Sequence, residues 1–102
     1  LETEFSKVKI LSINPNQMLS MQMHRYRSET WYITQGKATV TIGDKVVDLF
    51  PGESIFIEAN EKHRVQNFGD EVVEIIEVQS GTYFGEDDIV RFEDIYGRKD
   101  FH

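Results

Sequence analysis

The chain has 102 residues, with 11 Lys and Arg against 18 Asp and Glu, a formal net charge of -7 and no cysteine. This length is enough for one compact domain with a modest core, which we expect to span residues 1–102. The absence of cysteine excludes a disulfide framework, a thiolate metal site and a cysteine nucleophile, and it favours the cytoplasm.

Composition also excludes two kinds of partner. An acidic chain lacks the basic face that phosphate contacts need, so we expect no nucleic acid partner. No apolar run is long enough to span a membrane, so we expect no membrane partner. Because the chain begins with Leu1 rather than Met, we expect it to be a segment of a longer protein.

Polar and apolar residues alternate along most of residues 5–80, a pattern typical of half-buried strands. Turn residues such as Asn14-Pro15-Asn16, Gly36 and Gly43 interrupt the pattern, and the last two predict hairpins. Short strands are predicted at 7–13, 18–23, 31–34, 38–42, 46–49, 54–57, 64–67 and 72–78. Strands of this number and spacing predict an all-β barrel or sandwich, with Trp31, Tyr32, Phe56 and Ile75 in its core.

Residues 81–102 have a different character and predict a helical or irregular tail. The acidic run Glu86-Asp87-Asp88 is interpreted as a solvated helix start, with Asp87 or Asp88 as the N-cap. Three apolar residues follow at helical spacing and favour a short helical turn: Ile89, Phe92 and Tyr96.

The candidate ligands of a metal ion come from two segments. His102 stands at the end of the chain, which leaves His24 and His63. Gln22 and His24 lie two positions apart and so share one face of a strand. An isolated histidine is more often a hydrogen-bonded structural group than a ligand, so each gains weight only through its neighbours.

Those neighbours have the spacing of the two cupin motifs, and the chain resembles a cupin. Gln22-x-His24 is followed by Glu29 and Gly36, and Gly52 is followed by His63 and Asn67. The resemblance implies a jelly-roll barrel and a divalent metal ion, with zinc first and Mn, Co, Ni or Fe as alternatives. It implies the ligands Gln22, His24, Glu29 and His63, whereas by itself Gln22 is equally a barrel-lining amide. A mixed nitrogen and oxygen set suits these metals.

Two segments sharpen the resemblance. Residues 18–36 and 78–98, the latter containing GEDDIVRFEDIYGR, resemble the C-terminal domain of type II mannose-6-phosphate isomerases. This family is often fused behind a mannose-1-phosphate guanylyltransferase domain, which becomes an expected partner in cis or trans. The resemblance implies interconversion of mannose 6-phosphate and fructose 6-phosphate through an enediol. Tyr26 and Thr30 stand where the family usually has histidines, which puts the role of those imidazoles in doubt.

A sugar phosphate substrate needs cationic groups, and guanidinium groups match phosphate geometry. The resemblance favours Arg91 and Arg98 among the candidates, which are Arg25, Arg27, Arg64, Arg91, Arg98 and Lys99. For proton transfer we expect Glu58, with Glu61, Tyr26 and a metal-bound water as alternatives.

Two further functions stay open on the sequence alone. The chain can be a non-catalytic cupin module that binds a metal or a sugar and accompanies a guanylyltransferase. A metal-dependent oxygenase uses the same scaffold, although nothing in the sequence points to its substrate. The predicted edge strands and apolar sheet face favour a homodimer.

Overall fold

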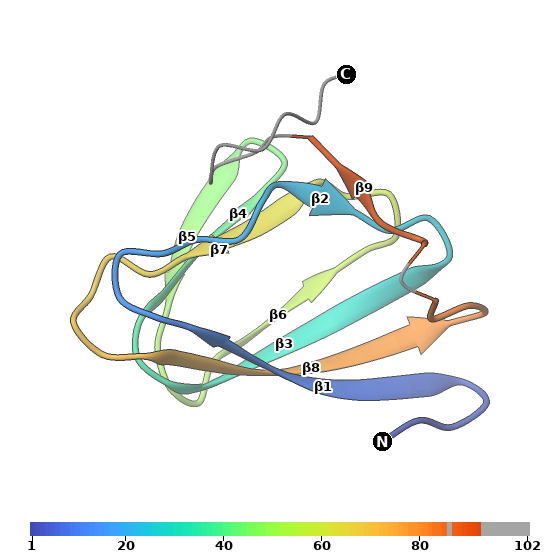
Figure 1. Ribbon diagram of the computed structural model, residues 1–102, viewed down its shortest axis with the longest axis horizontal. Coiled ribbons are helices and arrows are strands. Elements are labelled where there is room, and N and C mark those ends of the chain that lie inside the picture. Colours follow the sequence, from blue (N-terminus) through green and yellow to red (C-terminus); the bar gives the residue numbers. More distant parts are fainter. Residues whose placement is uncertain (86, 93–102) are drawn as a thin grey trace.

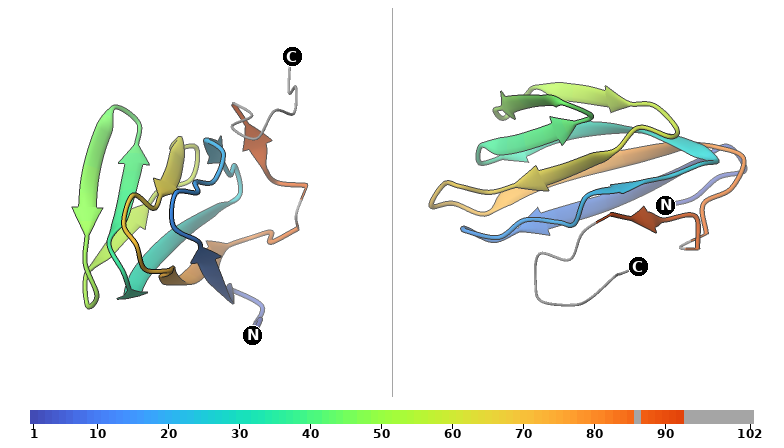
Figure 2. Two further views of the ribbon diagram at one scale, coloured as in Figure 1. Left: turned by 60° about the vertical axis from the view of Figure 1, so that its left-hand side comes forward. Right: turned by 90° about the horizontal axis from the view of Figure 1, so that it is seen from above.

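Residues 1–85 and 87–92 are described by a computed structural model, in which two antiparallel sheets face each other (Figure 1). The four-stranded sheet has the order β1 (Ser6–Ile13), β8 (Val73–Gly81), β3 (Arg27–Gln35) and β6 (Ser54–Ile57). The five-stranded sheet has the order β5 (Lys45–Leu49), β4 (Ala38–Ile42), β7 (His63–Gln66), β2 (Gln22–Met23) and β9 (Val90–Arg91). Figure 2 shows both sheets curling around a shared interior. The all-β prediction is confirmed, and among the described residues no helix could cross a membrane.

Each of the eight predicted strands has a counterpart, but the helical turn predicted after Asp88 is wrong where it can be checked. Val90 and Arg91 form strand β9, which pairs with β2 through Gln22↔Arg91 and Met23↔Val90. The free edge of β2 offers backbone partners to this segment, so its groups pair with β2 instead of with each other. Tyr96 and the rest of the predicted turn lie outside the described residues.

The inward face of the four-stranded sheet is apolar at one end and polar at the other. Along β8 the buried residues change from Val73 and Ile75 to Glu77 and Gln79. β3 runs in the opposite direction, so its polar residues meet those of β8: Glu29 pairs with Gln79. The apolar half holds the core, whose buried members are Ile13, Trp31, Ile33, Ala38, Val40, Ile57, Val65, Val73 and Ile75. The polar half is left for a site.

Two of the four predicted core residues point the other way. Trp31 and Ile75 are buried, as predicted, whereas Tyr32 is 45% exposed and Phe56 is 57% exposed. Side chains alternate across a strand, so Tyr32 must face outward once its neighbour Trp31 faces inward. The homodimer expected from this sheet stays a prediction.

Gly36 closes the turn between β3 and β4 in a conformation that needs glycine. Its φ is 77°, and a Cβ added there would lie 2.8 Å from the backbone oxygen of Val72. β3 and β4 belong to different sheets, so the hairpin predicted at Gly36 is wrong, whereas the one predicted at Gly43 is confirmed by the pairing of β4 with β5. The Gly36 turn carries the chain from one sheet to the other and lies against the start of β8.

Candidate metal centre

A cavity of about 170 Å³ occupies the polar half of the interior. Both sheets contribute to its walls, so residues from distant parts of the sequence meet there. The lining residues are Lys9, Leu11, Leu19, Gln22, His24, Arg27, Glu29, Trp31, His63, Glu77, Gln79, Ile89 and Arg91.

Three of the four expected ligands form a tight buried cluster in this cavity. Glu29 lies between the two histidines, with its Oε2 3.0 Å from Nε2 of His24 and its Oε1 3.4 Å from Nε2 of His63. The three ligand atoms all lie within 4.8 Å of one another. Each of the three side chains is 5% exposed or less.

Backbone carbonyls orient both imidazole rings. Nδ1–H of His24 donates to the carbonyl oxygen of Asp88 at 2.7 Å, and Nδ1–H of His63 donates to that of Glu61 at 2.9 Å. A carbonyl can only accept, so Nδ1 carries the hydrogen in each ring and Nε2 faces the cluster. This is the arrangement in which a metal-binding histidine usually stands.

Asp88 holds this arrangement from outside the cavity. Its two carboxylate oxygens accept the backbone N–H groups of Arg25 (2.9 Å) and Tyr26 (3.0 Å). The side chain is 5% exposed, so the interpretation of Asp88 as part of a solvated helix start is wrong. Asp88 instead ties the segment after β8 to the chain beside His24.

The charges of the cluster stabilise one another. Burial by itself raises the pKa of Glu29, but hydrogen bonds and positive charge from His24 and His63 outweigh it and lower the pKa to about 2. Burial lowers the pKa of His24, yet the hydrogen bond and charge of Glu29 and the Asp88 carbonyl raise it above 6.5. Glu29 is therefore ionised at every physiological pH, as a metal ligand must be.

The donor set fits a divalent metal ion. Ligand atoms about 2.1 Å from one ion stand about 3 to 3.5 Å from each other, which matches the two separations between Glu29 and the histidines. Gln22 lies opposite His63 in the β2–β7 register and is half-buried in the cavity wall. Gln22 therefore lines the same cavity as the cluster, and its role as the fourth ligand stays a prediction.

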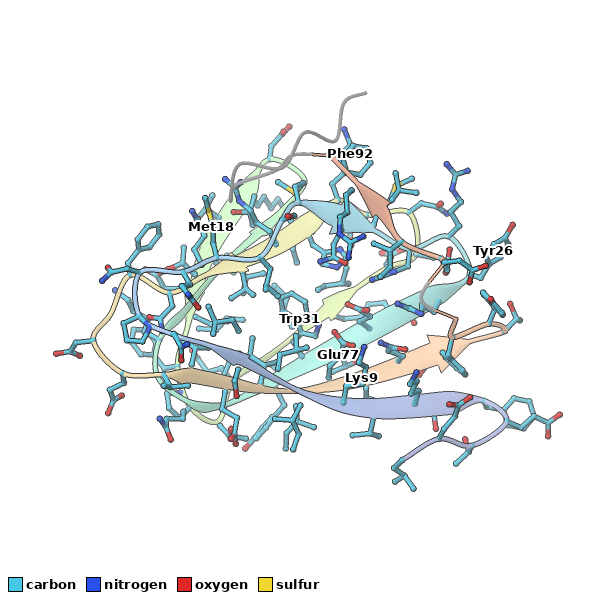
Figure 3. The ribbon with its side chains drawn as sticks, in the orientation of Figure 1. Lys9, Met18, Tyr26, Trp31, Glu77 and Phe92 are labelled. Atoms are coloured by element: carbon cyan, nitrogen blue, oxygen red, sulfur yellow. The ribbon has the colours of Figure 1, made fainter. Side chains whose placement is uncertain are left out.

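A second polar group occupies the same cavity beside the candidate metal ligands. Glu77 accepts hydrogen bonds from the indole N–H of Trp31 at 3.0 Å and from the amide of Gln79 at 2.5 Å. The same indole N–H also donates to Glu29 at 3.2 Å. In Figure 3, Lys9, Glu77 and Trp31 point into the space between the two sheets.

Burial raises the pKa of the Glu77 carboxyl above its usual range, and the negative charge of Glu29 raises it further. The hydrogen bonds from Gln79 and Trp31 and the charge of Lys9 oppose this rise without cancelling it. The two carboxyls of the cavity therefore differ: Glu29 is held ionised, and Glu77 can carry a proton more readily.

Two buried polar atoms in the cavity wall have no hydrogen-bond partner within the described part of the chain. They are Nε of Arg27, which lies 3.9 Å from Oε2 of Glu29, and Oε1 of Gln79. The Arg27 side chain is 3% exposed and donates from its Nη1 to the carbonyl of Gly85. Buried groups of this kind usually have a partner, so both atoms are available to a polar ligand.

The other expected site residues are placed as follows. Arg91 is exposed and lines the cavity, while Arg98 and Lys99 lie outside the described residues. Glu58 is exposed in the turn before β7 and does not line the cavity, so a role in proton transfer has no support in the geometry. The remaining candidates outside the cavity lining are Arg25, Tyr26, Glu61 and Arg64.

Sequence reasoning missed Glu77, Gln79, Lys9 and Asp88. The sequence does contain a signal for Glu77: it lies two and four positions after Ile75 and Val73, so the alternation along β8 places it on the same buried face. Asp88 gave no such signal, because its partners are 62 and 63 positions away and it follows a segment without periodicity.

The fold and the site together define a cupin, and comparison with solved structures supports this class. The chain superposes on a double-stranded β-helix protein from Klebsiella pneumoniae with a TM-score of 0.80 and 24% identity, covering 92% of this chain and 80% of that chain. The cupin domain of Schizosaccharomyces pombe Cnp3 gives a TM-score of 0.75 and 14% identity, covering 79% and 59%. Likeness at this level of identity concerns the fold.

Sequence comparison identifies the family. Residues 2–94 match the mannose-6-phosphate isomerase C-terminal family, and the chain belongs to it. The chain is 50% identical over 92 residues to the xanthan biosynthesis protein XanB of Xanthomonas campestris pv. campestris, and 46% identical over 92 residues to a mannose-1-phosphate guanylyltransferase of Salmonella montevideo. These alignments cover 90% of the chain and 20% of each relative, so the chain spans about a fifth of their length.

Proposed function

We propose that the chain is a metal-dependent isomerase that interconverts mannose 6-phosphate and fructose 6-phosphate. The observation that supports this most directly is one buried cavity that combines a His24–Glu29–His63 cluster, a second carboxyl and several cations, in a member of this family. Such an isomerisation moves a proton between C2 and C1 and develops negative charge on the oxygens of both carbons. The cavity offers groups for each of these tasks.

Gln22, His24, Glu29 and His63 would hold the divalent ion, with zinc as the first candidate and Mn, Co, Ni or Fe as alternatives. When bound, the ion would supply a Lewis acid that stabilises negative charge on the sugar oxygens. Carbonyl partners fix both histidines, so their ring nitrogens need no reorganisation to bind it.

Cations around the cavity would bind the phosphate. Arg91 stands exposed at the cavity wall, where a phosphate could be reached without burying it fully. Arg27 and Lys9 lie deeper, and Arg98 stays a proposal that rests on the family resemblance. A guanidinium can bind two phosphate oxygens at once, so replacing Arg91 by Lys would weaken substrate binding even though the positive charge is kept.

The non-catalytic module is the second candidate, and it was favoured by the missing histidines at Tyr26 and Thr30. Tyr26 is 58% exposed, and Thr30 pairs in register with the outward-facing Phe56. Neither residue lines the cavity. The departures from the family pattern therefore leave the cavity lining unchanged, which supports the enzyme over the module.

The test is a coupled assay of the purified chain, stripped of metal and reloaded separately with Zn, Mn, Co and Ni. We expect fructose 6-phosphate to form from mannose 6-phosphate only after reloading. His63→Ala should lose both bound metal and turnover, and the exposed Glu71→Gln is the matched control. Absence of turnover with every metal, together with a shift in melting temperature on adding mannose 6-phosphate, would favour the module.

We also propose that a guanylyltransferase acts alongside this domain, in the same chain or as a separate protein. A relative named mannose-1-phosphate guanylyltransferase aligns with this chain over 92 residues, which are only 20% of its own length. Co-purification from the source cells with mass spectrometry would identify such a partner or a longer form of the chain.

A further inference from the structure

Glu77 is a buried carboxyl in the cavity that the candidate metal ligands do not use. It is 5% exposed and faces the same space as His24, Glu29 and His63. We propose that Glu77 is the group that carries the proton between C2 and C1 of the bound sugar phosphate. This inference rests on the isomerase function proposed above and adds its acid–base residue.

Elimination among the lining residues points to Glu77. Glu29 is held by both histidines and would be a metal ligand, and the guanidinium groups of Arg27 and Arg91 do not release a proton. Lys9 pairs with Glu77 in the β1–β8 register, and a lysine ammonium group donates hydrogen bonds and accepts none. His24 and His63 would be metal ligands as well, so among the titratable residues that line the cavity Glu77 is left to accept a proton from carbon.

Hydrogen bonds to both carboxylate oxygens fix the position of Glu77, and each oxygen can still accept a further hydrogen. The Trp31 indole holds Oε1 and the Gln79 amide holds Oε2, and each carboxylate oxygen keeps a second lone pair. One indole nitrogen contacts both Glu77 and Glu29, so the two carboxyls are neighbours across a single N–H group. A sugar whose C1 and C2 oxygens face the candidate metal ligands would therefore present its C2 hydrogen near Glu77.

The step balances with these groups alone. The Glu77 carboxylate takes the proton from C2 of the aldose, and the electrons of that C–H bond form the C1=C2 bond while the C1 carbonyl oxygen takes up the negative charge. The hydroxyl proton on the C2 oxygen then passes to the C1 oxygen within the cis-enediolate. Glu77 returns its proton to C1, the C2 carbonyl forms, and the carboxylate is regenerated.

The test uses the chain loaded with the metal that gives turnover, and compares Glu77→Gln, Glu77→Asp and the exposed control Glu71→Gln. We expect Glu77→Gln to lower kcat by about 10²- to 10⁴-fold with a small change in KM and unchanged metal content. Glu77→Asp keeps a carboxyl and should retain more activity than Glu77→Gln. In D2O, deuterium on C1 of fructose 6-phosphate would support proton transfer, because a proton held by the Glu77 carboxyl can exchange with solvent before it is returned, whereas a hydride cannot.

The outcomes separate the two proposals. No turnover by the wild type with any metal overturns the isomerase function and this inference with it. Turnover by the wild type with an equally active Glu77→Gln overturns the inference alone. If Glu77→Gln and Glu77→Asp both lose the metal, Glu77 supports the metal centre and is not the proton carrier.

Discussion

The difference in pKa between Glu29 and Glu77 can be tested by measuring the free energy of unfolding of variants at each position. In metal-free protein we compare Glu29→Gln with Glu77→Gln, two substitutions of the same chemistry at buried sites that share the Trp31 indole. Lowering the pKa of Glu29 from 4.5 to about 2 corresponds to about 3 kcal/mol of stability in its ionised form. Glu29→Gln should lose about this amount, and Glu77→Gln should lose little or gain stability, because burial penalises the ionised form of Glu77.

The pH dependence follows from the direction of each shift. The folded-state pKa of Glu29 is lowered, so its contribution is present above pH 4.5 and disappears as the pH falls towards 2. The folded-state pKa of His24 is raised, so its contribution is present below pH 6.5 and disappears as the pH rises through the folded value. The cost of Glu29→Gln should therefore be largest between about pH 4.5 and 6.5.

Urea unfolding in EDTA, followed by Trp31 fluorescence, gives the two free energies at pH 6 and again at pH 3. Trp31 suits this purpose because it is 3% exposed and is the one tryptophan in the chain. Equal costs for Glu29→Gln and Glu77→Gln at pH 6 would refute the charge arrangement described here. So would a cost of Glu29→Gln that stays the same at pH 3.

Three further predictions concern the metal centre and the turn between β3 and β4. Because a metal must displace the proton from His24, whose pKa is raised, metal affinity measured by calorimetry should fall about tenfold per pH unit below that pKa, and a flat profile from pH 5 to 7.5 would contradict this. Asp88→Ala should weaken metal binding by about 10- to 100-fold through loss of support for His24, whereas the exposed Asp87→Ala should not. Gly36→Ala should cost at least about 1–3 kcal/mol in urea unfolding, and more than Gly43→Ala, since both have positive φ but only Gly36 lies against another backbone.

The strands of this molecule could be predicted because polar and apolar residues alternate along them. Alternation along the chain predicted eight strands because one face of each strand must be buried. Strand β9 escaped prediction because its two residues are held by the edge of β2, a contact that leaves no local pattern. Tyr32 and Phe56 were predicted to lie in the core because they are aromatic. The alternation of side chains along β3 and β6 instead places both on the outer face.

The candidate metal ligands were predicted from the resemblance to the two cupin motifs, and His24, Glu29 and His63 do form one buried cluster. The partners of that cluster could not be predicted in the same way. The Asp88 carbonyl and carboxylate act from a segment far along the chain, and the Glu61 carbonyl is a backbone group with no sequence signature. The types of side chain in a motif indicate its ligands. The groups that orient those ligands depend on which distant segment of the chain packs beside them, and the sequence does not show this.

The charges of the cavity complement the proposed substrate. Lys9, Arg27 and Arg91 line it against Glu29 and Glu77, so a divalent ion would make the loaded cavity strongly positive inside a chain whose net charge is -7. A sugar phosphate brings a phosphate dianion, and the enediolate adds one further negative charge as the reaction proceeds. Arg27 is buried and Lys9 is half-buried, so salt screens their attraction less than that of the exposed Arg91, and it acts on the small anion that enters the barrel.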